Sequence, residues 1–305
     1  MNTRQEGIES PRGSRMGAKF DEWDVNLPAY VDLEASTDPL AGDIKNTYTS
    51  PSAEDIHVRG PGYLNGEKVV DRTCKIPSEE SPYLIAGINV YRCKSDLTHI
   101  ASKVASLRDH VALQGAKDLK GSLYPQFLII TWNFRNSWTK EQTCVVHLFR
   151  RNDSLLLNGD DCGMADTFRR AFSSFIKGDQ DSRSRRLKFI FKVREATPSV
   201  KKSISALGGE KPVLIAKKLT TKFFEGPNYL EINQDVGSSI IASMLNSTIL
   251  KASSTMIVDT SWVLEAKDEE ELPERVLGVV RWNYVHLGDV CVALNKDYSL
   301  VPESA

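Results

Sequence analysis

The sequence of 305 residues has no run of about 18 apolar residues, the length that a membrane-spanning helix requires. Its first segment, from Met1 to Lys19, carries scattered charges and no apolar core, so we expect no secretory signal. The five cysteines are widely spaced and include no Cys-x-x-Cys pair. Reduced thiols fit this spacing better than a disulfide framework or a zinc site does. These absences predict a cytoplasmic protein.

Motifs for common catalytic chemistry are also missing. The chain has no Gly-x-x-x-x-Gly-Lys-Ser/Thr loop for phosphates, and Gly60-x-Gly62 lacks the third glycine of a dinucleotide fingerprint. Residues 237–239, Gly-Ser-Ser, fit a helix start better than a nucleophile elbow. The five histidines stand apart without metal-ligand spacing. The sequence therefore predicts no enzyme activity, no cofactor and no metal site.

One stretch is strongly basic although the net charge is only −1. Eleven basic and three acidic residues fall between residues 169 and 202. Within this stretch residues 187–194 alternate strictly, which predicts a strand with one apolar face and one cationic face carrying Lys188, Lys192 and Arg194. The cationic face either binds an anionic partner or only solvates the outside of a half-buried sheet. A net charge near zero and the lack of an aromatic-rich basic motif argue against nucleic acid.

Apolar periodicity predicts an α+β domain with a mainly antiparallel sheet. Stripes at helical spacing indicate two long helices at residues 164–177 and 238–250, which we expect to cover one sheet face. A START-like helix-grip shape is one form of this class. Runs of β-branched and aromatic residues, joined by polar or Gly-Pro links, indicate hairpin-connected strands. These strands are expected near residues 81–91, 127–134, 143–149, 187–194, 219–224, 229–236, 255–265 and 276–285.

Composition divides the chain into three parts. Residues 1–45 are rich in Gly, Pro, Ser and charge, and we expect a poorly ordered arm there. Residues 46–290 carry the strand and helix signals and form the folded domain. Residues 291–305 are expected to form a loose tail.

The helix at 238–250 has two contrasting sides. One side is an apolar stripe that we expect to be buried, and it consists of Ile240, Ile241, Met244, Leu245 and Ile249. The other side, around Ser243, is small, polar and uncharged, unlike the usual solvent-facing side of a helix. This side either packs inside the domain or lines a space for a ligand.

Three charged residues lie inside expected strands that are otherwise apolar. They are Glu231, Asp259 and Arg281. If they face solvent they need no explanation. If they face inward, each requires an ion pair or a polar cavity, because a buried unpaired charge is very costly. Such a cavity could anchor a lipid headgroup.

Two long strings carry a family resemblance. Residues 223–232 read FFEGPNYLEI and are followed by DVGSS, and residues 269–281 read EEELPERVLGVVR. Both resemble the C-terminal domain of the plant enhanced disease resistance two family, in an ordered match over about residues 30–290. In plant members this domain follows a pleckstrin-homology domain and a lipid-transfer START domain, and those proteins restrain defence and cell death. The resemblance implies no catalytic residues.

The leading hypothesis is a non-enzymatic soluble module that binds lipid or an anionic membrane surface, in the cytoplasm and at membranes. The alternative is a protein-interaction or regulatory module without a lipid ligand. The candidate ligand-binding residues are Lys188, Lys192, Arg194, Glu231, Ser243, Asp259 and Arg281.

Overall fold

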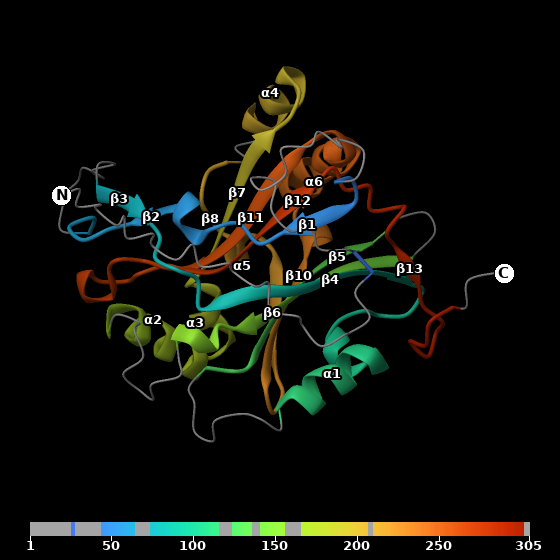
Figure 1. Ribbon diagram of the computed structural model, residues 1–305, viewed down its shortest axis with the longest axis horizontal. Coiled ribbons are helices and arrows are strands. Elements are labelled where there is room, and N and C mark those ends of the chain that lie inside the picture. Colours follow the sequence, from blue (N-terminus) through green and yellow to red (C-terminus); the bar gives the residue numbers. More distant parts are fainter. Residues whose placement is uncertain are drawn as a thin grey trace, which may run out of the picture.

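The computed structural model describes residues 26–27, 44–64, 74–115, 124–135, 141–155, 166–206 and 210–301. Their strands form two large sheets with helices around the margins (Figure 1). The strands are β1 (Thr47–Thr49), β2 (His57–Arg59), β3 (Lys75–Pro77), β4 (Tyr83–Cys93), β5 (Phe127–Arg135), β6 (Gln142–Arg151), β7 (Leu187–Glu195), β8 (Val213–Leu214), β9 (Thr220–Glu225), β10 (Tyr229–Asp235), β11 (Ile257–Leu264), β12 (Val276–Asn283) and β13 (Val292–Ala293). The α-helices are α1 (Ala105–Gly115), α2 (Asp166–Lys177), α3 (Gln180–Ser184), α4 (Pro198–Ala206), α5 (Ile215–Lys218) and α6 (Ile240–Ala252).

The first sheet has five strands in the order β1-β12-β11-β7-β8, and every neighbouring pair is antiparallel. Its central strands β11 and β12 are rich in Val, Ile and Trp and are buried almost along their whole length. Burial on both faces explains why they read as nearly continuous apolar runs. The hairpin β2–β3 adds a small apolar cluster against Val263, Val276 and Val279.

The second sheet has six strands in the order β13-β4-β6-β5-β10-β9. Its pairs are antiparallel except for two, since β10 runs parallel to β5 and β13 runs parallel to β4. The β9–β10 hairpin turns at Gly226-Pro227, as the sequence predicts. The expectation of an α+β fold with mainly antiparallel sheets is therefore confirmed.

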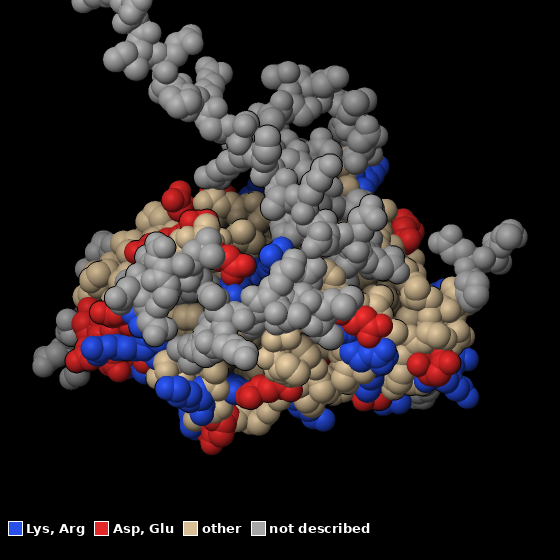
Figure 2. Space-filling model, turned by 60° about the horizontal axis from the view of Figure 1, so that its bottom comes forward, with Lys and Arg blue, Asp and Glu red and all other residues tan. Residues whose placement is uncertain are grey.

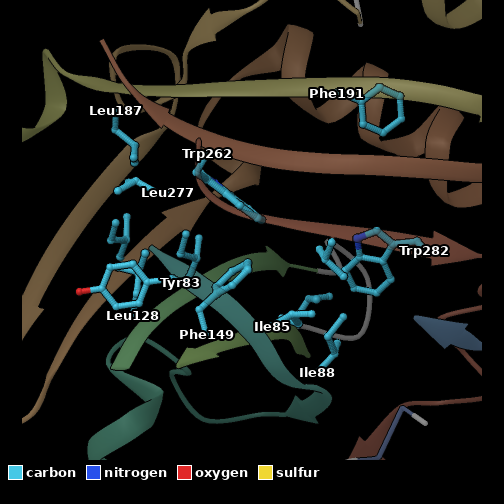
Figure 3. Packing of buried hydrophobic residues seen from close by; sticks show 14 of the residues in the cluster. Tyr83, Ile85, Ile88, Leu128, Phe149, Leu187, Phe191, Trp262, Leu277 and Trp282 are labelled. Atoms are coloured by element: carbon cyan, nitrogen blue, oxygen red, sulfur yellow. The ribbon is translucent and has the colours of Figure 1, made fainter. Parts of the chain in front are cut away.

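The main core lies between the two sheets. Figure 3 shows Trp262 and Leu277 of the first sheet pointing toward Phe149, Tyr83 and Leu128 of the second. The rings of Trp262 and Phe149 meet edge to face, with centroids 5.7 Å apart. Aromatic pairs at this distance and angle add to the hydrophobic stabilisation of the core.

The expected pair of long helices over one sheet face is not confirmed. Four of them, α1, α2, α4 and α6, have nine residues or more. The apolar stripe of α2 packs on the core through Phe172 and Phe175, which contact Tyr83 and Phe223. Helix α1 contributes to a second core on the other side of the six-stranded sheet. This arrangement does not confirm a START-like helix grip.

Helix α6 departs most from its sequence pattern. Its bounds agree with the predicted 238–250 within two residues at each end, and Ile249 packs against the main core. Ile240, however, is 81% exposed, so its expected burial is wrong. The side chains of Ile241, Met244 and Leu245 lie outside the described residues. A helical stripe fixes which residues share a side, but it does not say how far the first turn projects beyond the core.

Parts of both terminal segments join the sheets. Of the expected N-terminal arm only Asn26, Leu27 and residues 44–45 are described, and Leu27 is fully buried beside Ile88 of β4. The Asn26 amide donates to the carbonyl oxygens of Val90 and Val290 and accepts from the Val90 N–H. In the C-terminal segment, β13 pairs with β4. The sequence gives little sign of these contacts, because the segments that make them are short.

The face-to-face packing of the sheets makes Gly278 a sensitive position. A Cβ atom there would lie 2.7 Å from Cε1 and 2.8 Å from Cδ1 of the fully buried Phe149. Gly278→Ala should therefore overpack the core and lower the free energy of unfolding by about 1–3 kcal/mol. Urea denaturation measures this change. Gly288→Ala is the matched control, because the nearest atoms to its Cβ belong to the exposed side chain of His286. Equal stabilities of the two variants would contradict this packing.

Candidate functional site

The predicted cationic face of β7 is not free. Lys188 is buried, and its ammonium group donates to both carboxylate oxygens of Glu274 at 2.6 and 2.7 Å. The side chains are only 6% and 1% exposed. Burial lowers the pKa of Lys188, and the Glu274 carboxylate opposes that shift. The expectation that Lys188 faces solvent is therefore wrong, because residues 265–274 and the β2–β3 hairpin cover this end of the strand.

Arg194 and Arg281 share one carboxylate. Asp259, which is fully buried, accepts from Nε of Arg281 at 2.7 Å and from Nε of Arg194 at 2.5 Å. Asp55, in the 3₁₀ helix η1 (Ala53–Asp55), pairs with both guanidinium groups. Lys192 donates to the Asp55 carbonyl oxygen at 3.3 Å. The requirement for an ion pair, predicted for inward-facing charges in these strands, is met at Asp259 and Arg281.

The acidic string at 269–274 supplies further internal partners. Glu269, in the 3₁₀ helix η8 (Glu269–Glu271), accepts from the N–H groups of Gly62 and Leu64. Glu271 accepts from Arg186 at 2.6 Å and from the Lys267 N–H at 2.8 Å. These carboxylates tie together segments far apart in the sequence. This part of the family string therefore has a structural role.

The other family string, at 223–232, holds the 3₁₀ helix η3 (Ile100–Ser102). The ring of Phe224 stacks on His99, with centroids 4.4 Å apart and planes 3° apart. The hydroxyl group of Tyr229 lies 2.9 Å from Nε2 of His99. Gly226 is required beside them, since a Cβ there would lie 2.1 Å from the Tyr229 ring.

Glu231 completes this contact from inside the domain. Its carboxylate accepts from the N–H groups of Ile100 and Ala101, both at 3.0 Å, and the residue is fully buried. Burial raises the pKa of Glu231 to about 7, against the opposing effect of these two hydrogen bonds and of Lys103. An anionic group at the start of a short helix satisfies N–H groups that have no partner within the helix. Glu231 therefore anchors η3.

The seven candidate residues do not form one site. Arg194, Asp259 and Arg281 lie together, with Lys192 beside them, whereas Lys188 lies farther along β7. Glu231 belongs to the other sheet. Ser243 is partly buried in α6, and its hydroxyl group donates to the Val236 carbonyl oxygen at 3.3 Å.

A shallow basic hollow of about 500 Å³ lies near the ends of α2 and α3. Its charged lining consists of Lys177, Arg185, Arg186 and Lys267. Arg185, Arg186 and Lys267 each pair with a carboxylate. On the face shown in Figure 2, Lys and Arg lie among Asp and Glu and do not gather in one patch. Within the part of the chain that the structure describes, Lys177 is the lining cation without such a partner.

Exposed lysines without a described ion-pair partner also occur along the segment from α4 to β9, which the sequence patterns do not single out. Six lysines between α4 and β9 are exposed, and no carboxylate among the described residues pairs with them. They are Lys201, Lys202, Lys211, Lys217, Lys218 and Lys222. Strands β8 and β9 are edges of their two sheets, and α5 connects them. The exposed acids of this segment are engaged: Glu210 accepts from the Val193 N–H, and Glu225 pairs with Arg183.

The start of α6, which carries the exposed Ile240, lies next to the start of β9. The Ser238 hydroxyl oxygen accepts from the Thr220 N–H at 2.8 Å, which places the start of α6 next to the start of β9. Thr220 lies two residues from both Lys218 and Lys222. Ile240, two residues after Ser238, thus lies near the chain segment that carries Lys218 and Lys222. None of the helices in the described ranges is long and apolar enough to cross a membrane.

The raised pKa of Glu231 predicts a distinct dependence of stability on pH. A carboxyl group with a pKa of 4.5 when unfolded and about 7 when folded binds its proton more tightly in the folded state. Its contribution to stability is complete below pH 4.5 and is lost as the pH rises through 7. Between pH 4.5 and 7, the free energy of unfolding of the wild-type protein should therefore fall by up to about 3 kcal/mol relative to that of Glu231→Gln.

Urea denaturation of both proteins from pH 4.5 to 8 measures this difference. The glutamine loses one hydrogen bond at every pH, which offsets the two curves but does not change their relative slope. His147, whose pKa burial lowers to about 3, gives a slope of opposite sign in both proteins and so cancels. Parallel curves over the whole range would show that Glu231 titrates normally.

Comparison with known proteins finds the family that the two strings resemble. The family model described as "Protein ENHANCED DISEASE RESISTANCE 2, C-terminal" matches residues 48–286. A protein of Arabidopsis thaliana named ENHANCED DISEASE RESISTANCE 2-like is 34% identical over 121 residues, which are 40% of this chain and 16% of that protein. The chain thus spans a small part of that relative, and no solved structure gives a significant match. The chain belongs to the family of the C-terminal domain of ENHANCED DISEASE RESISTANCE 2.

Proposed function

We propose that this domain is a non-enzymatic module that binds an anionic membrane surface peripherally. The contact surface consists of the unpaired lysines of α5 and β9, Lys217, Lys218 and Lys222, together with Ile240. One observation carries the proposal: Ile240 is 81% exposed near the start of β9, in a region whose lysines no described carboxylate neutralises. Lysines around an exposed aliphatic side chain match a surface that offers negative headgroups and an apolar interior.

The free energies involved favour lysines outside β7 as the residues that contact the membrane. A basic residue near an anionic membrane contributes about 1 kcal/mol to binding. The partial insertion of one large aliphatic side chain adds at most about 1.5–3 kcal/mol. Lys188 is buried, and Arg194 and Arg281 are committed to Asp259, so membrane binding by these residues would first break internal ion pairs. Breaking a buried ion pair costs about 3–5 kcal/mol. This cost exceeds the free energy that one basic residue contributes to membrane binding.

The basic hollow extends this surface. Helix α5 contacts α3, and Arg185 follows α3 directly at the rim of the hollow. The pair of Arg185 with Asp181 is an exposed pair within one helical segment, of a kind that contributes only about 0.3–0.5 kcal/mol. Arg185 can therefore exchange Asp181 for a phosphate group at small cost, with Lys177 alongside it.

The family suggests the setting of this activity. The name of the Arabidopsis relative links that protein to disease resistance. A role of this domain in plant disease resistance, at cytoplasmic membrane surfaces, is part of the proposal. The competing function is a protein-interaction module whose lysine surface receives an acidic protein. Membrane binding is favoured because Ile240 is exposed near the segment that carries the lysines.

The triple variant Lys217→Glu, Lys218→Glu, Lys222→Glu tests the proposal. Sedimentation with vesicles of phosphatidylserine and phosphatidylcholine measures the partition coefficient. Loss of about 1 kcal/mol at each of three positions should weaken binding about a hundredfold. Ile240→Ser should weaken it further without changing the net charge.

The matched control is Lys45→Glu, Lys94→Glu, Lys296→Glu, which changes the net charge equally. These exposed lysines lie next to β1, β4 and β13; β1 and β13 are the sheet edges opposite to β8 and β9, and β4 is the neighbour of β13. The control should keep most of the wild-type binding. Equal losses in both triple variants, or no binding by the wild type, would sink the membrane proposal in favour of a protein partner.

A further inference from the structure

An aromatic cluster built around Trp132 of β5 packs against the main core. The Trp132 ring lies 4.6 Å from His147, 5.7 Å from Trp262 and 5.8 Å from Phe189, measured between centroids. His147 and Trp262 contact each other at 4.9 Å. Both sheets contribute to the cluster, and Figure 3 shows Trp262 pointing from its own sheet toward the other. The cluster is therefore the place where the two sheets meet most closely through aromatic rings.

The protonation of His147 in this cluster follows from one contact. Its Nδ1 atom lies 2.8 Å from the carbonyl oxygen of Ile130. A carbonyl oxygen only accepts, so Nδ1 carries the proton. Burial lowers the pKa of His147 to about 3, so the ring is neutral and its Nε2 atom is an acceptor. This Nε2 atom is buried and has no hydrogen-bond partner among the described residues.

Two donors in the same cluster also lack partners. The Gln234 amide oxygen accepts from Nε1 of Trp132 at 2.9 Å, which fixes the orientation of the amide and makes its Nε2 atom a donor. Within the described part of the chain, this atom and Nε1 of Trp262 are buried without a partner. Buried polar groups in folded proteins are nearly always satisfied. One acceptor and two donors without a described partner thus belong to three residues that contact or bond the same tryptophan.

Two rings of the cluster are partly exposed. Trp132 and Phe189 have their side chains on the faces of β5 and β7 that pack against the main core, yet both are only partly buried. The partly exposed Trp132 ring contacts His147 and Trp262 and is hydrogen-bonded to Gln234, so it joins the surface to the buried polar atoms.

We propose that this cluster binds the hydroxyl group of an otherwise apolar alcohol. The hydroxyl oxygen accepts from Nε1 of Trp262 and Nε2 of Gln234, and its proton is donated to Nε2 of His147. The apolar part of the ligand packs on Trp132 and Phe189. A hydroxyl group matches the set of two donors and one acceptor, whereas a carboxylate or an ether oxygen cannot donate to His147. This ligand site is separate from the surface lysines and does not depend on their role.

Binding of 1-octanol to the full chain tests the proposal, with heptyl methyl ether as the probe that lacks the hydroxyl proton. The indole N–H signal of Trp262 in nitrogen–proton NMR spectra is the readout, assigned by its loss in Trp262→Phe. We expect saturable movement of this signal with 1-octanol and about tenfold weaker binding of the ether, the effect of one hydrogen bond. Gln234→Met should weaken 1-octanol binding by a similar factor.

Three outcomes would overturn the proposal. They are equal affinities for the alcohol and the ether, a Trp262 signal that stays fixed while other signals move, and no response to 1-octanol at all. The last outcome includes a cluster satisfied only by a bound water molecule. Because the two probes are compared on the wild-type protein, the test stands even if a variant fails to fold.

Discussion

The ion pair of Lys188 with Glu274 shows the main constraint on this structure, which is that charged strand residues lie where water is excluded. An unpaired charge in such a place is too costly, so each must find a partner. Lys188 binds Glu274, and Asp259 binds Arg194 and Arg281. These pairs hold the acidic loop and η1 onto one face of the five-stranded sheet. Lys188 and Arg194 of β7 are therefore engaged in internal ion pairs, whereas Lys192 contacts only the Asp55 carbonyl oxygen.

This constraint changes how the two family strings are interpreted. The string at 269–281 supplies Glu269, Glu271 and Glu274 to internal partners and places Gly278 against Phe149. The string at 223–232 fixes η3 in place, because Glu231 accepts from its first N–H group and Phe224 stacks on His99. Both strings thus identify the fold through residues that build it. The proposed functions lie elsewhere, at the lysines and Ile240 on the surface and at the aromatic cluster inside.

Local patterns predict much of this fold, and contacts between distant segments account for what they miss. Strand β7, the β9–β10 hairpin and helix α2 lie within two residues of their predicted positions, because period and turn chemistry are local properties. The alternation in β7 assigns Lys188 to a face but does not reveal that residues near Glu274 cover that face. The parallel pairing of β5 with β10 joins strands about 100 residues apart, which no local signal specifies. The lysines of α5 and β9 become a surface only where two sheet edges meet.

Acetylation of lysines, followed by mass spectrometry with and without phosphatidylserine vesicles, tests the central claim that Lys188 of β7 is internal and the lysines of α5 and β9 are available. Without vesicles, Lys217, Lys218 and Lys222 should react quickly and Lys188 should remain unmodified in the folded protein. With vesicles, those three lysines should become protected while Lys45 keeps its reactivity. Rapid modification of Lys188 in the folded protein, or protection at Lys45 instead of the α5 and β9 lysines, would contradict the account.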